Sequence, residues 1–228
     1  MRKLFLLILL LAGCSSEGLM TGDLVFVAAP GETGTGSISD AIVASTSKDS
    51  LNIIHVGIIS VDGGHVSVLD ATGERGVAIR SLDEFYEDFR LDDGSLPEMI
   101  VKRLDDNSRA EEYVGKALRY VGEPYDDYFM HDNGAHYCSE LVFDSYVKED
   151  GTRIFPSVSM NFKAADGTYP EYWEKLFGEL GVPVPQGAPG TNPQAMFLSP
   201  ELHTVCQLPP RRRTLLPDCR RQSRHVSE

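Results

Sequence analysis

The segment His136-Tyr137-Cys138-Ser139-Glu140-Leu141-Val142-Phe143 decides how this chain is interpreted. It places a thiol at the start of a predicted amphipathic helix, in which Cys138 shares one face with the apolar Leu141 and Val142. The first turn of a helix offers unpaired backbone N–H groups and a partial positive charge, and both favour a thiolate. A buried structural cysteine is the alternative interpretation, because cysteine is common in protein cores.

A histidine that could act as a base lies on a predicted strand upstream. Residues 53–61 and 65–71 are apolar and rich in β-branched side chains, and Asp62-Gly63 between them is a turn sequence, so we expect a hairpin. If these two residues form the turn, His55 faces Asp70 on one side of the pleat. A carboxylate opposite an imidazole can fix its tautomer and stabilise its protonated form.

The length of the turn decides whether this pair forms. A three-residue turn over 62–64 would pair His55 with Ala71 and send the carboxylate to the opposite face. The two-residue turn places Ile59 opposite Val66, and this apolar match favours it. Spacing alone leaves both registers open.

The remaining pattern mixes strands and helices without regular alternation. We expect an α+β fold, with helices packed against an antiparallel sheet. Capping-box spacing at Ser81–Glu84 and Ser108–Glu111 predicts two helix starts. The other expected strands are residues 20–27, 77–79 and 99–104, and the expected helices are residues 39–46, 81–89, 108–121 and 172–180.

The amino terminus has the features of an export signal. Arg2 and Lys3 precede an apolar run over residues 4–11, which is too short to span a bilayer. The sequence Leu11-Ala12-Gly13-Cys14 that follows resembles a bacterial lipobox. The resemblance implies that residues 1–13 are a lipoprotein signal peptide, that Cys14 is lipidated, and that the protein is tethered to the periplasmic side of the outer membrane. An ordinary secretory signal is the alternative.

Charge divides the rest of the chain into two parts. The net charge is −13 over 228 residues, but the tail 203–228 is basic, with six arginines against two acidic residues. The body 14–202 is therefore strongly acidic, which argues against a nucleic-acid partner. We expect one domain over 14–202 and a basic, disordered tail over 203–228.

The other cysteines suggest no metal site. The chain has no Cys-x-x-Cys pair, so we expect no metal and no cofactor. Cys206 and Cys219 could form a disulfide in an oxidising compartment. His65, His131 and His136 are expected to be surface residues.

Several short motifs occur in an order that is similar to that of a known family. They are Gly22-Asp23-Leu24-Val25-Phe26, His55-Val56-Gly57-Ile58-Ile59, Leu69-Asp70-Ala71, Gly122-Glu123-Pro124-Tyr125-Asp126 and Tyr137-Cys138-Ser139-Glu140-Leu141-Val142. Together they resemble the YiiX/YebB-like branch of the NlpC-type papain-like cysteine hydrolases, over about residues 20–202. This branch has a circularly permuted papain-like fold, so the histidine strand precedes the cysteine helix.

The resemblance implies roles for individual residues. Cys138 would be the nucleophile, His55 the general base and acid, and Asp70 the third, polar residue. Tyr137 would help to shape the oxyanion hole, although packing at the helix start is an equal alternative for it.

Three functions follow as hypotheses. The first is a membrane-anchored cysteine hydrolase that cleaves an amide bond in cell-wall peptides through a thioester intermediate. The second is a lipid-directed thiol acyl hydrolase or acyltransferase, and the third is a non-catalytic binding lipoprotein. A wide apolar groove beside Cys138 would favour a lipid acyl substrate, and a narrow polar cleft would favour a peptide.

Overall fold

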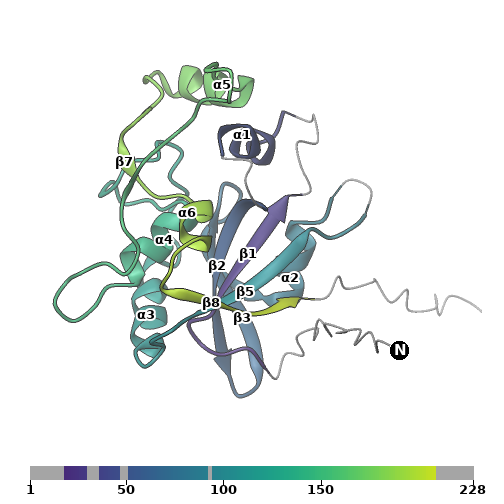
Figure 1. The fold of residues 1–228 in the computed structure, drawn as a ribbon, viewed down its shortest axis with the longest axis vertical. Helices are drawn as coiled ribbons and strands as arrows, with labels where there is room; N and C mark the ends of the chain where they lie inside the picture. The colour runs from purple at the N-terminus through teal and green to yellow at the C-terminus, as the bar shows by residue number, and fades with distance from the viewer. Residues whose placement is uncertain (1–17, 30–35, 47–50, 92–93, 209–228) are drawn as a thin grey trace, which may run out of the picture.

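A six-stranded antiparallel sheet forms the centre of the molecule (Figure 1). The computed structural model describes residues 18–29, 36–46, 51–91 and 94–208. The strand order is β4-β3-β2-β1-β5-β8, and every neighbouring pair is antiparallel. The strands are β1 (Leu24–Ala29), β2 (Asn52–Asp62), β3 (His65–Thr72), β4 (Gly76–Ser81), β5 (Glu98–Leu104) and β8 (Leu202–Leu208).

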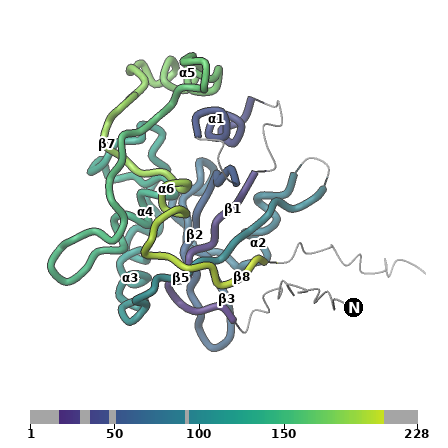
Figure 2. Tube along the Cα trace, viewed as in Figure 1, coloured from purple at the N-terminus to yellow at the C-terminus, as the bar shows by residue number. Residues whose placement is uncertain are grey.

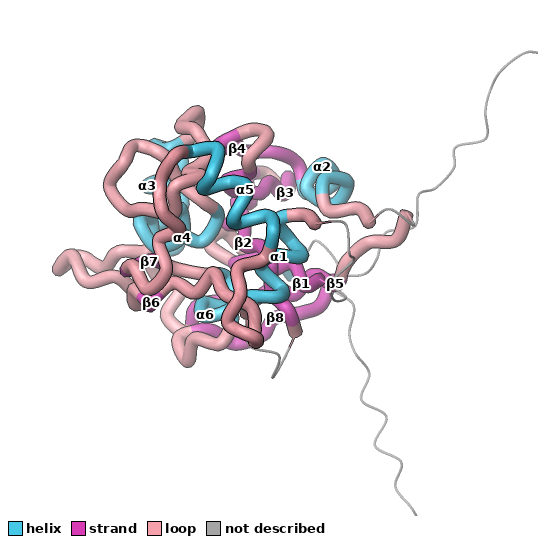
Figure 3. The backbone as a smooth tube through the Cα atoms, turned by 90° about the horizontal axis from the view of Figure 1, so that it is seen from above, coloured by secondary structure: helices cyan, strands magenta, loops and turns pink. Residues whose placement is uncertain are grey.

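Helices cover both faces of this sheet, so the predicted α+β class is confirmed. Seen from above, α3 (Ala110–Ala117) and α4 (Cys138–Ser145) lie on one side and α2 (Leu82–Asp88) on the other (Figure 3). Beyond one end of the sheet, α1 (Ile38–Ser45) lies beside α5 (Glu171–Leu180) (Figure 2). The short elements are η2 (Leu118–Tyr120), β6 (Val158–Ser159), β7 (Pro189–Gly190) and α6 (Pro193–Phe197). Each helix among the described residues is too short or too polar to span a bilayer.

The central strands are buried on both faces. Leu24 and Phe26 of β1 pack with α4, whereas Val25 and Val27 pack in the cluster that includes Phe85 of α2. Since alternate side chains of a strand point to opposite faces, both sets must be apolar. This explains why β1 has a continuous apolar sequence with no polar alternation.

The β2–β3 hairpin forms, but its predicted register is wrong. Asp62 pairs with His65, so Gly63-Gly64 is the turn in place of Asp62-Gly63. Gly63 and Gly64 both have positive φ. Two-residue hairpin turns favour positive φ at their central residues. The pairing therefore slips by two residues, and Ile59 faces Val68.

One of the two predicted capping boxes is present. Ser81 accepts from the Glu84 N–H, and Glu84 accepts from the Ser81 N–H at 2.9 Å, at the start of α2. The box predicted at Ser108 is absent, because its hydroxyl donates to Asp106 at 2.6 Å. Helix α3 accordingly begins at Ala110 with no side-chain cap.

The carboxyl-terminal strand β8 corrects the predicted boundary at residue 203. Leu202–Leu208 pairs along β5 and completes one edge of the sheet, with Leu202 and Leu208 buried. Residues 203–208 are therefore part of the domain and not of a disordered tail. The remainder of the tail, Cys219 with its predicted disulfide to Cys206, residues 1–13 and Cys14 all lie outside the described residues.

Two glycine positions hold neighbouring segments close to the sheet. Gly22 has φ +82°, and its carbonyl accepts from the Tyr146 hydroxyl at the end of α4 at 2.9 Å. Gly76 has φ +65°, and a Cβ there would lie 2.2 Å from the Glu123 carbonyl oxygen. Both sites need glycine because of the positive φ and the close approach.

Candidate active site

Cys138 is the first residue of α4, as the sequence predicts. Its side chain is buried but borders a cavity. The first hydrogen bond inside the helix runs from the Leu141 N–H to the Tyr137 carbonyl at 3.0 Å. The amides before Leu141 have no partner within the helix, so the sulfur lies beside donors that can stabilise negative charge.

His55 comes from β2, where the pairing with β1 is irregular. A register shift between Val27 and Ala28 interrupts the ladder just beyond the Val27–His55 pair. Such irregularities redirect side chains near active sites. The imidazole is almost completely buried and packs against the Phe89 ring, with the ring centres 4.6 Å apart.

The imidazole joins the thiol to a carboxylate. Nε2 of His55 lies 2.7 Å from Oδ2 of Asp70, and the Cys138 side chain is near enough to the ring to raise the pKa of His55. Because Asp70 occupies Nε2, Nδ1 is the ring atom left for the sulfur. The structure therefore brings together three sequence-predicted residues, Cys138, His55 and Asp70.

The contact between His55 and Asp70 survives the error in register. The two-residue slip preserves which face each side chain occupies, since side chains alternate with a period of two. His55 and Asp70 are thus diagonal neighbours on one face rather than a directly opposed pair.

Opposing effects act on His55. Burial, the largest effect, lowers its pKa, while the neighbouring Cys138 thiolate and the hydrogen bond to Asp70 raise it. The raising effects win and bring the pKa of His55 to about 9. An imidazole that holds its proton at neutral pH can serve as a general acid beside the thiol.

Asp70 is buried and has a second partner that sequence reasoning missed. Arg80 of β4 donates from Nη2 to Oδ2 of Asp70 and from Nη1 to Asp88 of α2. The β3–β4 register pairs Val68 with Arg80, so the arginine lies on the same face as Asp70. An arginine within an otherwise apolar strand was the available signal for this contact.

Tyr137 precedes the nucleophile and is the N-cap of α4. Its hydroxyl accepts from the backbone N–H of Thr191 at 2.9 Å, and the side chain is buried with Phe129 and Phe162. These contacts connect the helix start to the segment before α6. The predicted role of Tyr137 in an oxyanion hole stays a prediction.

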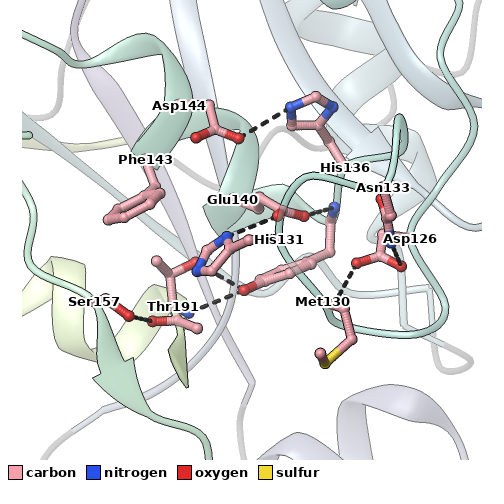
Figure 4. Close-up of polar contacts among 12 residues, drawn as sticks. Asp126, Met130, His131, Asn133, His136, Glu140, Phe143, Asp144, Ser157 and Thr191 are labelled. Atoms are coloured by element: carbon pink, nitrogen blue, oxygen red, sulfur yellow. Dashed lines mark hydrogen bonds and ion pairs between the residues drawn. The ribbon is translucent and has the colours of Figure 1, made fainter. Parts of the chain in front are cut away.

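A polar cluster supports the start of α4 from behind (Figure 4). Glu140 accepts from the Tyr137 N–H at 3.4 Å and lies 2.9 Å from Nδ1 of His131. Burial, with the nearby Asp126 and Asp144 charges, raises the pKa of Glu140 to about 9. Glu140 is therefore protonated at neutral pH and adds no negative charge beside the thiol.

The loop before α4 is organised by a single carboxylate, Asp126. It accepts from the N–H groups of Tyr128 and Met130 and from the Asn133 amide, at 2.8 to 2.9 Å (Figure 4). Asp126 lies in a motif quoted above, but no sequence pattern indicated this role.

Of the three histidines expected at the surface, His65 is exposed and His131 is half-buried. His136 is buried, so its prediction is wrong. Its Nε2 lies 3.2 Å from Asp144 of α4, and its ring packs against Tyr120. These two contacts give the buried ring a polar partner and an aromatic one.

A cavity of about 590 Å³ opens beside Cys138. Asp127 is the one charged residue among the described residues that line it. Its walls come from α1, the loop before α4, α5 and the segments that flank α6. Most of the lining is aliphatic or aromatic, including Ile38, Ile42, Ile54, Phe89, Tyr125, Phe129, Met160, Phe162, Tyr172, Trp173 and Leu198.

The fold and this arrangement define a papain-like cysteine hydrolase in which the histidine strand precedes the cysteine helix. The chain belongs to the permuted papain-like amidase enzymes of the YaeF/YiiX, C92 family, whose model matches residues 18–206. The permuted papain-like fold that the sequence motifs suggested is thereby confirmed, as is the cysteine hydrolase class.

Individual relatives agree with this assignment. The uncharacterized protein YiiX of Escherichia coli K12 is 27% identical over 190 residues, which cover 82% of this chain and 86% of the relative. A crystal structure of YiiX from Escherichia coli O157:H7 matches with a TM-score of 0.62 at 24% identity, covering 83% of this chain and 98% of that one. That YiiX is described as a metalloprotein. In the described part of the present chain, no three His, Cys, Asp or Glu residues are grouped so that they could hold a metal ion.

Proposed function

We propose that this chain hydrolyses an amide bond with Cys138 as the nucleophile, His55 as the base and acid, and Asp70 as the residue that orients His55. The thiolate attacks the carbonyl carbon, and the N–H groups at the start of α4 stabilise the oxyanion. The His55 imidazolium then gives its proton to the leaving amine, and an acyl thioester remains on Cys138. Water then gives a proton to the neutral His55 and attacks the thioester carbon, so that the acid product is released and Cys138 leaves as the thiolate beside a protonated His55.

The observation that carries this proposal is the grouping of three side chains: Asp70 contacts His55, Cys138 is near enough to raise the pKa of His55, and Cys138 itself lines the cavity. The thiol lies at a helix start, its partner is an imidazole with a raised pKa, and a substrate-sized space adjoins it. A buried structural cysteine would require neither the buried imidazole–carboxylate pair nor the adjoining cavity.

Two substrate classes are proposed for this site. Amides of cell-wall peptides are the first, because the amino-terminal sequence predicts a location in the cell envelope. An apolar acyl group is the second, and the lining of the cavity supports it more strongly. A peptide with several charged groups would find Asp127 as its one charged partner among the described lining residues, whereas an acyl chain would bury its surface against the aromatic walls.

Turnover by the purified full-length chain tests the catalytic proposal. Two probes are used, soluble cell-wall peptide fragments and a long-chain N-acyl anilide, each with wild-type protein and with Cys138→Ala. We expect the wild type to release amine and the Ala variant to lose at least about 1,000-fold in kcat. Undiminished turnover by Cys138→Ala would contradict the assignment of the nucleophile.

The same probes separate the two substrate classes. Ile42→Trp narrows the cavity at α1 without touching the reacting groups. If the cavity holds an acyl chain, this variant should lose turnover of the long-chain anilide and keep that of an acetyl anilide. Release of amine from cell-wall fragments alone would favour the peptide class.

We also propose that Cys14 carries a lipid and that this lipid holds the protein at the outer membrane. The support is the basic, apolar and Leu-Ala-Gly-Cys order of residues 2–14. Radioactive palmitate fed to expressing cells should label the wild type and not Cys14→Ala. The variant should also leave the membrane fraction.

A further inference from the structure

Arg80 places a positive charge inside the core beside the candidate catalytic site. Its side chain is 2% exposed, and its guanidinium bridges Asp70, which is 1% exposed, and Asp88, which is 27% exposed. The planar fork of arginine can bind two carboxylates at once, which a lysine cannot do in the same way. Arg80 therefore connects α2 to the carboxylate that holds His55.

Stability alone is a weak explanation for this arginine. Its guanidinium lies 5.2 Å from the centre of the Phe85 ring, and its buried Nε has no hydrogen-bond partner among the residues that the structure describes. Burying a charge with an unmatched donor is costly, and apolar replacements of buried ion pairs often leave proteins equally or more stable. The contact with Asp70 is the feature that an apolar side chain could not replace.

Asp70 uses one oxygen for two partners. Oδ2 accepts from Nη2 of Arg80 and lies 2.7 Å from Nε2 of His55. Four charged or titratable groups surround Asp70. They are His55 of β2, Arg80 of β4, Asp88 of α2 and, beyond the imidazole, Cys138 of α4. Among these groups, Arg80 is the one with a permanent positive charge, so it offsets the cost of burying the Asp70 carboxylate.

We infer that Arg80 is a positioning residue, which holds the Asp70 carboxylate directed at Nε2 of His55 and so keeps the imidazole oriented for its work on Cys138. Asp88 orients the guanidinium from the opposite side. This inference rests on the proposed catalytic roles of Cys138 and His55. Arg80 itself touches neither the thiol nor the cavity lining among the described contacts.

Alkylation of Cys138 by iodoacetamide tests the inference without a known substrate. The full-length chain is treated between pH 5 and 9, and the modified Cys138 peptide is quantified by mass spectrometry. In Arg80→Met we expect the rate at pH 7 to fall about tenfold, and the pH of half-maximal rate to rise by about one unit. Asp70→Asn should produce a fall of similar size, and the double variant Arg80→Met/Asp70→Asn should fall no further.

The matched control is Arg75→Met. Arg75 also contacts Asp88, at 3.3 Å, but its side chain is 40% exposed and it does not contact Asp70 in the described structure. Arg75→Met removes the same charge as Arg80→Met, and Cys138 in this control should be alkylated at the wild-type rate. If Arg80→Met fails to fold, Arg80→Lys replaces it, with a rate between those of the wild type and Asp70→Asn.

Each outcome has a defined meaning. An Arg80→Met rate within about twofold of the wild type, or a loss that adds to that of Asp70→Asn, would overturn the inference and leave the proposed function standing. If His55→Ala and Asp70→Asn both leave Cys138 alkylation unchanged, the proposed catalytic site itself fails. A fall in Arg80→Met that is absent in Arg75→Met and does not add to Asp70→Asn supports the inference.

Discussion

The raised pKa of His55 should fall when the sulfur of Cys138 is replaced by oxygen. The charge of Cys138 is the largest of the effects that raise this pKa, ahead of the hydrogen bond that His55 donates to Asp70, while burial lowers it. Cys138→Ser keeps nearly the same shape but removes the negative charge. We therefore expect the pKa of His55 to fall from about 9 to near or below its ordinary value of about 6.5.

The effect of this pKa shift on folding stability follows from the ordinary and the raised pKa of His55. A rise from 6.5 to about 9 corresponds to about 3 kcal/mol of preference for the protonated imidazole in the folded protein. Because folding raises this pKa, the stabilisation is fully present below pH 6.5 and is lost as the pH rises through 9. Urea unfolding should show a loss of this order across that window in the wild type and little change in Cys138→Ser.

NMR titration of the histidine ring signals measures the pKa directly. His55→Gln identifies the His55 signal by its disappearance, and the exposed His65 serves as an internal reference that should titrate equally in both proteins. A His55 pKa in Cys138→Ser within half a unit of the wild-type value would refute the idea that the thiolate holds the proton on the imidazole.

Three further predictions concern stability and turnover. Tyr146→Phe leaves a buried carbonyl without its 2.9 Å donor and should lower the free energy of unfolding by about 1–2 kcal/mol in urea, whereas Tyr128→Phe, at an exposed position, should have no effect. Gly76→Ala would place a Cβ 2.2 Å from a backbone carbonyl at positive φ and should cost about 2 kcal/mol or more. Gly73→Ala, with open space around it, is the control, and equal losses in the two variants would contradict the steric argument. Turnover of any amide should decline above about pH 9 as His55 loses its proton, and a rate that keeps rising to pH 11 would contradict its role as the acid.

Most strands and helices could be predicted from local sequence patterns, because each of these patterns reflects a physical constraint on a single element. The apolar runs of β1 and β2, the Ser81–Glu84 box and the helical face after Cys138 each correspond to an observed element. The β8 strand was missed because its sequence is only partly apolar. An edge strand pairs on one side and needs little burial, so its periodicity is weak.

The part of the site that depends on the alternation of side chains along a strand could be predicted from the sequence. Alternation along β2 and β3 placed His55 and Asp70 on one face even though the turn was assigned two residues too early. Arg80 and Asp126 were missed because a charged residue in a strand or loop is usually solvated. Their inward direction depends on partners from α2 and on backbone N–H groups within the loop, which sequence spacing does not reveal.

The order of segments along the chain affects how the protein becomes reactive during synthesis. The meander β2-β3-β4 carries the imidazole, the carboxylate and the guanidinium, and it leaves the ribosome before α4 does. The histidine, carboxylate and guanidinium of the site therefore precede Cys138 along the chain. We therefore expect Cys138 to become an activated nucleophile only once α4 packs beside the meander.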